Sequence, residues 1–196
     1  MSKAVLISIR PKWVEKIANG EKTIEVRKTR PKLKTPFKCY IYCTLPKYPH
    51  EDFIATDYPM PQFYGGGKII GEFVCDCVTP LYNVCMDDWK RLAGGLHNIE
   101  KELVNQACLA EAKLHTYAGG KNCFAWHISN LKIYDAPKKL WDFWRDCPEY
   151  SELSTNCWSC ENVCGDGNET DCNTDGRLYL HRPPQSWCYV EVMKDD

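Results

Sequence analysis

The chain of 196 residues has no apolar run that approaches the roughly 20 residues of a membrane-spanning helix. Its first apolar run, Ala4–Ile9, is too short for the hydrophobic region of a secretory signal, and no small-residue cleavage site accompanies it. Repeats and low-complexity tracts are absent as well, so nothing in the sequence favours a repeat architecture. We therefore expect a cytoplasmic protein that does not contact a membrane.

Net charge is also nearly absent, at −1 for the whole chain, but the charges are unevenly distributed. Residues 1–50 carry 12 lysines and arginines against 3 acidic residues, a local charge of +9. Residues 51–196 carry 13 against 23, a local charge of −10. A basic first quarter indicates an anion-binding face, although a solvated positive surface would give the same numbers.

Thirteen cysteines are an odd number, and without an export signal we do not expect disulfides. Five of them fall within residues 146–176, an acidic stretch with almost no aliphatic residues to form a core. The Cys-x-x-Cys spacing at 157–160 lets two thiolates reach one tetrahedral zinc ion, which would explain how this stretch folds. A reduced loop without metal is the alternative. The expected zinc ligands are Cys147, Cys157, Cys160 and Cys172, with Cys164 as a substitute.

Hydrophobic periodicity predicts a mixture of strands and helices. The first strand, Ala4–Ile9, precedes a helix that starts near Pro11 and stops at Gly20. Most strands lie too close in sequence for helical crossovers, which favours an α+β fold with a small mixed β-barrel and flanking helices. We expect one domain over residues 1–196 with an insertion at 146–176. Further strands are predicted at Thr23–Arg27, Phe37–Cys43, Lys68–Val78, Cys123–Tyr134 and Ser186–Val192, and helices at Asn98–His115 and Leu140–Trp144.

The predicted strand Thr23–Arg27 alternates, so Glu25 and Arg27 share one face. Lys22 comes directly before this strand, in the turn after the first helix. A lysine and an arginine there can hold a phosphate or a base carbonyl, and a carboxylate can accept from an exocyclic amine. A plain ion pair on a solvated face, worth about 0–1 kcal/mol, is the alternative interpretation.

The segment Gly20–Arg27 resembles the Gly-x-Lys-x-x-Glu-x-Arg signature of the ASCH superfamily, which is related to PUA domains. Residues 8–11 and 182–191 are similar to the start and end of phage and bacterial members. The resemblance implies a PUA-like barrel whose cleft, lined by the signature residues, binds RNA or a modified nucleoside. The predicted binding residues are Arg10, Lys22, Glu25, Arg27 and Trp187.

Trp187 enters this set because aromatic side chains on the last strand can stack a base. Such residues also close barrel cores, and the sequence leaves both interpretations open.

Whether the protein is an enzyme is also open. One branch of the family hydrolyses the acetyl group of 4-acetylcytidine with a threonine three positions after the signature lysine, where this chain has Glu25. If the chain is such an amidohydrolase, Lys22 and Glu25 are the candidate catalytic residues, with Thr23 and Glu72 as weaker ones. A third possibility is a protein-interaction adaptor that uses the acidic insertion, including a role in phage biology.

Overall fold

The computed structural model describes residues 3–45, 53–54, 63–81, 98–147 and 177–193. Most of the predicted insertion at 146–176 therefore lies outside the described residues. The helices are α1 (Pro11–Ala18), α2 (Asn98–Gln106), α3 (Glu111–Ala118) and the short 3-10 helix η3 (Leu140–Asp142). The strands are β1 (Lys3–Ile9), β2 (Ile24–Arg27), β3 (Phe37–Cys43), β4 (Phe53–Ile54), β5 (Phe63–Tyr64), β6 (Lys68–Cys75), β7 (Val78–Leu81), β8 (Cys123–His127), β9 (Ser129–Lys138), β10 (Trp144–Asp146), β11 (Arg177–Tyr179) and β12 (Trp187–Glu191).

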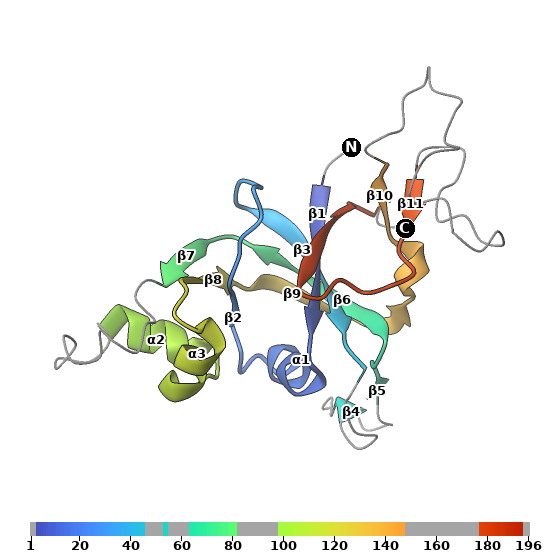
Figure 1. Cartoon of the computed structure of the whole chain (residues 1–196). Coiled ribbons are helices and arrows are strands. Elements are labelled where there is room, and N and C mark those ends of the chain that lie inside the picture. The colour runs from blue at the N-terminus through green and yellow to red at the C-terminus, as the bar shows by residue number, and fades with distance from the viewer. Residues whose placement is uncertain (1–2, 46–52, 55–62, 82–97, 148–176, 194–196) are drawn as a thin grey trace.

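Two sheets organise the molecule (Figure 1). The larger has the strand order β12-β1-β3-β6-β9, with β1 and β3 parallel and the other pairs antiparallel. The smaller is antiparallel, with the order β2-β8-β7. The predicted α+β class is therefore confirmed. A closed barrel is not seen among the described residues, because the edge strands β9 and β12 do not pair with each other.

The apolar run that begins the chain forms β1, an interior strand of the larger sheet between β12 and β3. Its residues are buried on both faces: Val5 and Ile7 belong to one hydrophobic cluster, and Ala4 and Leu6 to another. A strand covered on both sides has an unbroken hydrophobic sequence rather than an alternating one. This position explains why Ala4–Ile9 is entirely apolar except for Ser8.

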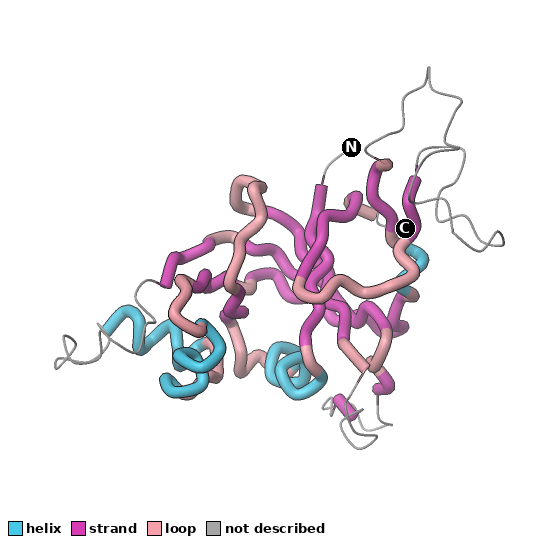
Figure 2. Tube along the Cα trace, viewed as in Figure 1, coloured by secondary structure: helices cyan, strands magenta, loops and turns pink. Residues whose placement is uncertain are grey.

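The predicted helix Asn98–His115 is in fact two helices, α2 and α3 (Figure 2). The break is at Cys108, whose φ of 53° is left-handed and incompatible with a continuing helix. Both helices contribute to a third hydrophobic cluster, which also contains Ile24 and Val26 of β2. The apolar residues of the predicted helix therefore belong to two short helices packed on the smaller sheet.

Three other predicted elements are shorter than the sequence suggested. The strand predicted over Lys68–Val78 divides into β6 and β7, and that over Cys123–Tyr134 divides into β8 and β9. Each division passes the chain from one sheet to the other. The helix predicted at Leu140–Trp144 is only η3, followed by β10. A continuous apolar pattern does not reveal where a strand changes sheets.

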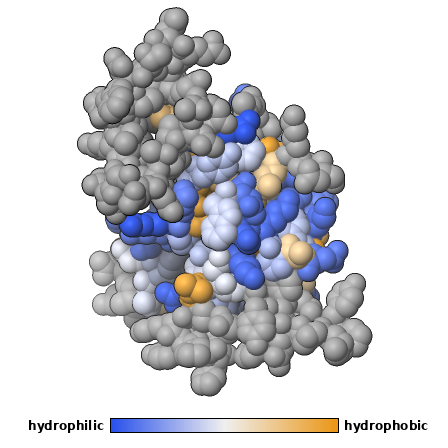
Figure 3. All heavy atoms as spheres, turned by 90° about the vertical axis from the view of Figure 1, so that its right-hand side faces the viewer, coloured by the Kyte–Doolittle hydropathy of each residue, from blue (hydrophilic) through white to orange (hydrophobic). Residues whose placement is uncertain are grey.

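Within the described part of the chain, no helix combines the length and apolar character needed to span a bilayer. Figure 3 shows the face that lies on the right-hand side in Figure 1. Its visible described atoms are mainly hydrophilic, and hydrophobic residues occur among them only in small separate groups. Single exposed apolar residues are normal on a protein surface. The described atoms visible on this face therefore form no extended apolar patch.

Candidate functional site

Lys22 is buried, although it lies in a turn. Gly20, with a φ of 74°, ends the helical turn after α1, and the Lys22 backbone N–H donates to the Lys16 carbonyl at 2.9 Å. This turn directs the side chain inward, where only 3% of the residue is exposed. Its Nζ donates to the Ala107 carbonyl at 2.8 Å and lies 3.3 Å from Oε2 of Glu25. Lys22 therefore differs from most turn lysines, whose side chains are exposed to solvent.

Glu25 and Arg27 lie on β2 at alternate positions and point to the same side. Arg27 Nη2 is 3.1 Å from Oε1 of Glu25 and donates to the Ser8 carbonyl at 2.6 Å, while Nη1 donates to Ser186 Oγ at 3.3 Å. Glu25 is 7% exposed and Arg27 is 8% exposed. Together with Lys22 they form a continuous, buried polar group, which we call the Lys22–Glu25–Arg27 cluster.

This cluster contains two cations and one carboxylate, so its net charge is +1. Buried charges are tolerated only when they are paired and hydrogen-bonded, because desolvation costs several kcal/mol per ion. Each carboxylate oxygen of Glu25 faces one cation. Arg27 Nε has no hydrogen-bond partner among the described residues. A buried donor of this kind is normally satisfied, and an acceptor on a ligand would satisfy it.

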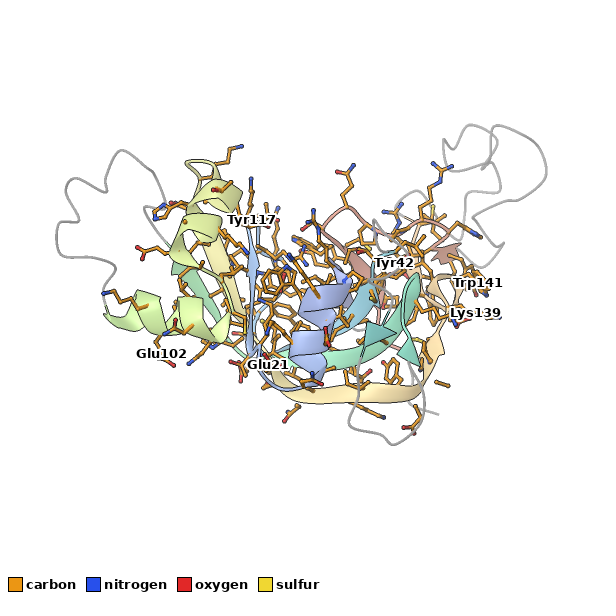
Figure 4. The ribbon with its side chains drawn as sticks, turned by 90° about the horizontal axis from the view of Figure 1, so that it is seen from below. Glu21, Tyr42, Glu102, Tyr117, Lys139 and Trp141 are labelled. Atoms are coloured by element: carbon orange, nitrogen blue, oxygen red, sulfur yellow. The ribbon has the colours of Figure 1, made fainter. Side chains whose placement is uncertain are left out.

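A cavity of about 640 Å³ opens beside the cluster. Its walls come from the end of β1, the first turn of α1, β2, the α2–α3 connection with α3, and the loop before β12. Figures 1 and 4 show β2 running between α1 and the α2–α3 pair, with Tyr117 of α3 beside it. The lining residues are Ser8, Ile9, Arg10, Lys12, Trp13, Lys22, Glu25, Val26, Arg27, Thr44, Leu109, Lys113, Tyr117, Pro183, Pro184, Gln185 and Ser186.

The charge of the cavity lining is strongly positive. Five lining residues are cations and one is a carboxylate, which gives +4. Three of the cations, Arg10, Lys12 and Lys113, are exposed, and in the part of the chain that the structure describes none of them forms an ion pair. A concave site with this excess of positive charge attracts anions. The size also suits a nucleotide-sized ligand.

Of the five predicted binding residues, four line this cavity and Trp187 does not. The Trp187 ring packs at 5.9 Å from Trp126 and at 5.4 Å from Tyr189, and its Nε1 donates to Thr29 Oγ1 at 3.0 Å. These contacts place the indole against the main hydrophobic cluster. The half-buried ring therefore packs beside that cluster and does not line the cavity.

The two weaker catalytic candidates lie apart from the cavity. Glu72 is on β6, where it accepts hydrogen bonds from Lys38 at 3.1 Å and from the Tyr134 hydroxyl at 2.6 Å. Thr23 is exposed, and its backbone N–H donates to the Gln106 carbonyl at 3.0 Å. Neither residue lines the cavity beside Lys22 and Glu25.

Several lining residues were not identified from the sequence, among them Lys113 and Tyr117 of α3 and the loop 183–186. They reach the cavity from segments that lie between 86 and 166 residues from the signature along the chain. For Lys12 and Trp13 the sequence held a partial signal, because both lie in the basic segment 1–50 that indicates an anion-binding face. For α3 no comparable signal exists, because a single lysine on a short helix has no distinguishing pattern.

Most of the predicted zinc ligands lie outside the described residues. Cys147 is buried at the end of the described segment, and the other four predicted ligands lie outside the described residues. Among the residues that are described, no group of three or more histidines, cysteines, aspartates or glutamates could hold a metal ion. The zinc site at 146–176 stays a prediction.

No family model and no curated protein matches the chain. Among solved structures, it is similar to ASCH from Zymomonas mobilis, at 19% identity over 70% of this chain and 73% of that one, with a TM-score of 0.44. A variant of that protein gives 19% identity, 71% and 77% coverage, and a TM-score of 0.46. The N-terminal domain of Staphylothermus marinus McrB is 12% identical over 71% of this chain and 81% of that one, with a TM-score of 0.34. Two of these structures carry the family name that the Gly20–Arg27 motif resembles, but similarity at this level assigns no activity.

Proposed function

We propose that the cavity binds RNA or a modified pyrimidine nucleoside. The observation that supports this proposal is the buried Lys22–Glu25–Arg27 cluster at the wall of a cavity whose lining carries a charge of +4. Such a site combines hydrogen-bonding groups for a base with positive charge for a phosphate. These are the two parts of a nucleotide that proteins recognise separately.

The cluster has free capacity to recognise a base edge. Each oxygen of Glu25 has two lone pairs and faces one cation, so it can still accept from an exocyclic amine such as that of cytosine. Arg27 Nε can donate to a ring carbonyl or ring nitrogen. Tyr117, 41% exposed at the cavity, offers an aromatic ring on which a base can stack.

Fluorescence anisotropy with short labelled RNAs at two salt concentrations tests the proposal. We expect binding that weakens as salt rises, because phosphate contacts release counterions. At a given salt concentration, Arg10→Gln should weaken RNA binding relative to the unmodified protein. Arg30→Gln is the matched control, because Arg30 is exposed in the same basic segment but does not line the cavity. Absence of binding at low salt would contradict the proposal.

Amide hydrolysis is the second candidate. It is favoured by the proximity of the Glu25 carboxylate and the Lys22 ammonium, 3.3 Å apart beside the cavity. A carboxylate can activate water while a cation stabilises the oxyanion that forms. Incubation with 4-acetylcytidine, followed by chromatography for cytidine, separates the candidates. Turnover that disappears in a folded Lys22→Met variant would favour the enzyme, and no turnover would favour the binding protein.

An adaptor role for the acidic residues 146–176 is a separate proposal. Deletion of residues 148–176 tests it: normal RNA binding by the shortened chain would leave that segment available for another partner.

A further inference from the structure

We infer that the ligand of this cavity carries a phosphate group and binds with its base toward the Lys22–Glu25–Arg27 cluster and its phosphate toward Arg10, Lys12 and Lys113. This inference rests on the proposed function and makes it more specific. It assigns a nucleotide, rather than an uncharged nucleoside, to the cavity. We call Arg10, Lys12 and Lys113 the rim cations because they are the exposed cations of the lining.

The inner cations are already engaged by the protein. Lys22 Nζ is paired with Glu25 and hydrogen-bonded to the Ala107 carbonyl. The Arg27 guanidinium is paired with Glu25 and hydrogen-bonded to Ser8 and Ser186, which leaves only its Nε without a partner. The Glu25 carboxylate would also repel a phosphate that came this close. The cluster is therefore suited to the neutral, hydrogen-bonding edge of a base.

The rim cations, in contrast, have charges that no carboxylate of the described residues neutralises. Lys12 Nζ lies 4.9 Å from the centre of the Trp13 ring, a contact that leaves its ammonium positive. The rim cations come from two separate elements: Arg10 and Lys12 from the start of α1, and Lys113 from α3. Positive charge is thus concentrated at the open side of the cavity.

Backbone groups add to the same field. The first turns of α1 and α3 both contribute lining residues, and neither N-cap residue, Arg10 or Ala110, caps its helix with a side-chain hydrogen bond. α1 also has no acidic residue in its first turn. The N-terminus of α1 carries partial positive charge, which favours phosphate, although Pro11 has no N–H and the Trp13 N–H donates to the Arg10 carbonyl. At α3, Glu111 in the first turn opposes the same effect. The end of α1 therefore adds to the positive field of the rim cations, whereas the end of α3 does not.

Isothermal titration calorimetry with the full chain tests the inference. The ligands are the four common nucleosides, their 5′- and 3′-monophosphates, and inorganic phosphate, each at low and moderate salt. We expect at least one monophosphate to bind about tenfold or more tightly than its nucleoside, with an advantage that shrinks as salt rises. The comparison of 5′- and 3′-monophosphates shows on which side of the sugar the rim lies.

A variant pair tests the role of the rim directly. Lys113→Gln should weaken binding of the preferred monophosphate by about threefold to tenfold and leave its nucleoside within about twofold. Lys121→Gln is the matched control, because Lys121 is an exposed lysine shortly after α3 that does not line the cavity. It should leave both affinities unchanged.

The possible failures are distinguishable. If a nucleoside and its monophosphates bind equally, the rim makes no phosphate contact: the inference is overturned and the proposed function stands. Inorganic phosphate binding as tightly as the best monophosphate would show an anion site without base recognition, which also overturns it. If none of the nucleosides or monophosphates binds, and neither the labelled RNAs nor 4-acetylcytidine binds either, both the inference and the proposed function are wrong.

Discussion

Glu25 holds together the charged centre of this protein. Among the described residues it is the only carboxylate that lines the cavity, and it lies between two buried cations that belong to different parts of the site. Through Lys22 it is connected to the α2–α3 break, and through Arg27 to the loop before β12. One side chain thus fixes the relative positions of three walls, which is a structural role independent of any ligand.

Glu25→Gln should lower the free energy of unfolding by about 3 kcal/mol. The amide keeps the shape of the side chain but leaves two buried cations without their shared counter-charge, which is the costly way to break a buried ion pair. Urea denaturation measures the effect. Glu102→Gln is the control: Glu102 is exposed and accepts only from Gln106, so we expect a change within about 0.5 kcal/mol. A loss below about 1 kcal/mol for Glu25→Gln would contradict the prediction.

Glu191 on β12 predicts a dependence of stability on pH. Burial raises the pKa of its carboxyl group, and the neighbouring Asp146 raises it further. A carboxyl group whose pKa is higher in the folded than in the unfolded chain stabilises the folded protein when it is protonated. This stabilisation is fully present below the pKa of the unfolded chain. It is lost as the pH rises through the pKa of the folded chain. At neutral pH, therefore, the ionised Glu191 is unfavourable.

Glu191→Gln should consequently increase the free energy of unfolding at about pH 7 and leave it nearly unchanged at about pH 3, where the carboxyl group is protonated in both states. Denaturation curves at a series of pH values measure the difference. Glu111→Gln, at an exposed position in α3, should show no such gain. A loss of stability at neutral pH would mean that the charge of Glu191 is favourable, contrary to this argument.

At the scale of elements, the contact between β6 and β9 is close at one point. A Cβ atom added to Gly71 would lie 2.5 Å from the Lys132 carbonyl oxygen and 3.2 Å from Cα of Ile133. Both are backbone atoms of the paired strand, so neither can rotate away. Glycine inside a strand commonly marks a close approach of this type.

Gly71→Ala should therefore destabilise the protein by about 2 kcal/mol, since the two strands must separate to admit the methyl group. Gly119→Ala is the comparison: its φ of 58° strains an alanine, but nothing lies within 4 Å of the new Cβ. That strain alone costs about 1 kcal/mol. Thermal and urea unfolding measure the loss of stability in both variants. The prediction is wrong if Gly71→Ala destabilises the protein less than Gly119→Ala does.

The zinc prediction belongs to the scale of the whole molecule, because it concerns how residues 146–176 are held within one chain. Protein purified without chelator should contain about one zinc ion per chain by elemental analysis. Cys160→Ser should lower the zinc content strongly. Cys77→Ser should not, since Cys77 is an exposed cysteine outside the predicted ligand set. Zinc well below one ion per chain in the unmodified protein would remove the proposal.

The sequence alone determined the inner part of the candidate site. A turn at Gly20 followed by strand alternation fixes Lys22, Glu25 and Arg27 relative to one another, because all three lie within one short local structure. The same local rules identified β1 and most of the other strands. They did not show where a strand passes between sheets, nor that Cys108 breaks the helix, since both depend on packing between distant elements.

Only the tertiary structure decided what surrounds that local group. Burial of Lys22 requires the carbonyl of Ala107, 85 residues along the chain, and the position of Arg27 requires Ser186, 159 residues along the chain. The same packing makes Lys113 a rim cation and places the half-buried Trp187 against the main hydrophobic cluster. Local geometry follows from neighbouring residues, whereas a cavity is enclosed by segments that only folding brings together.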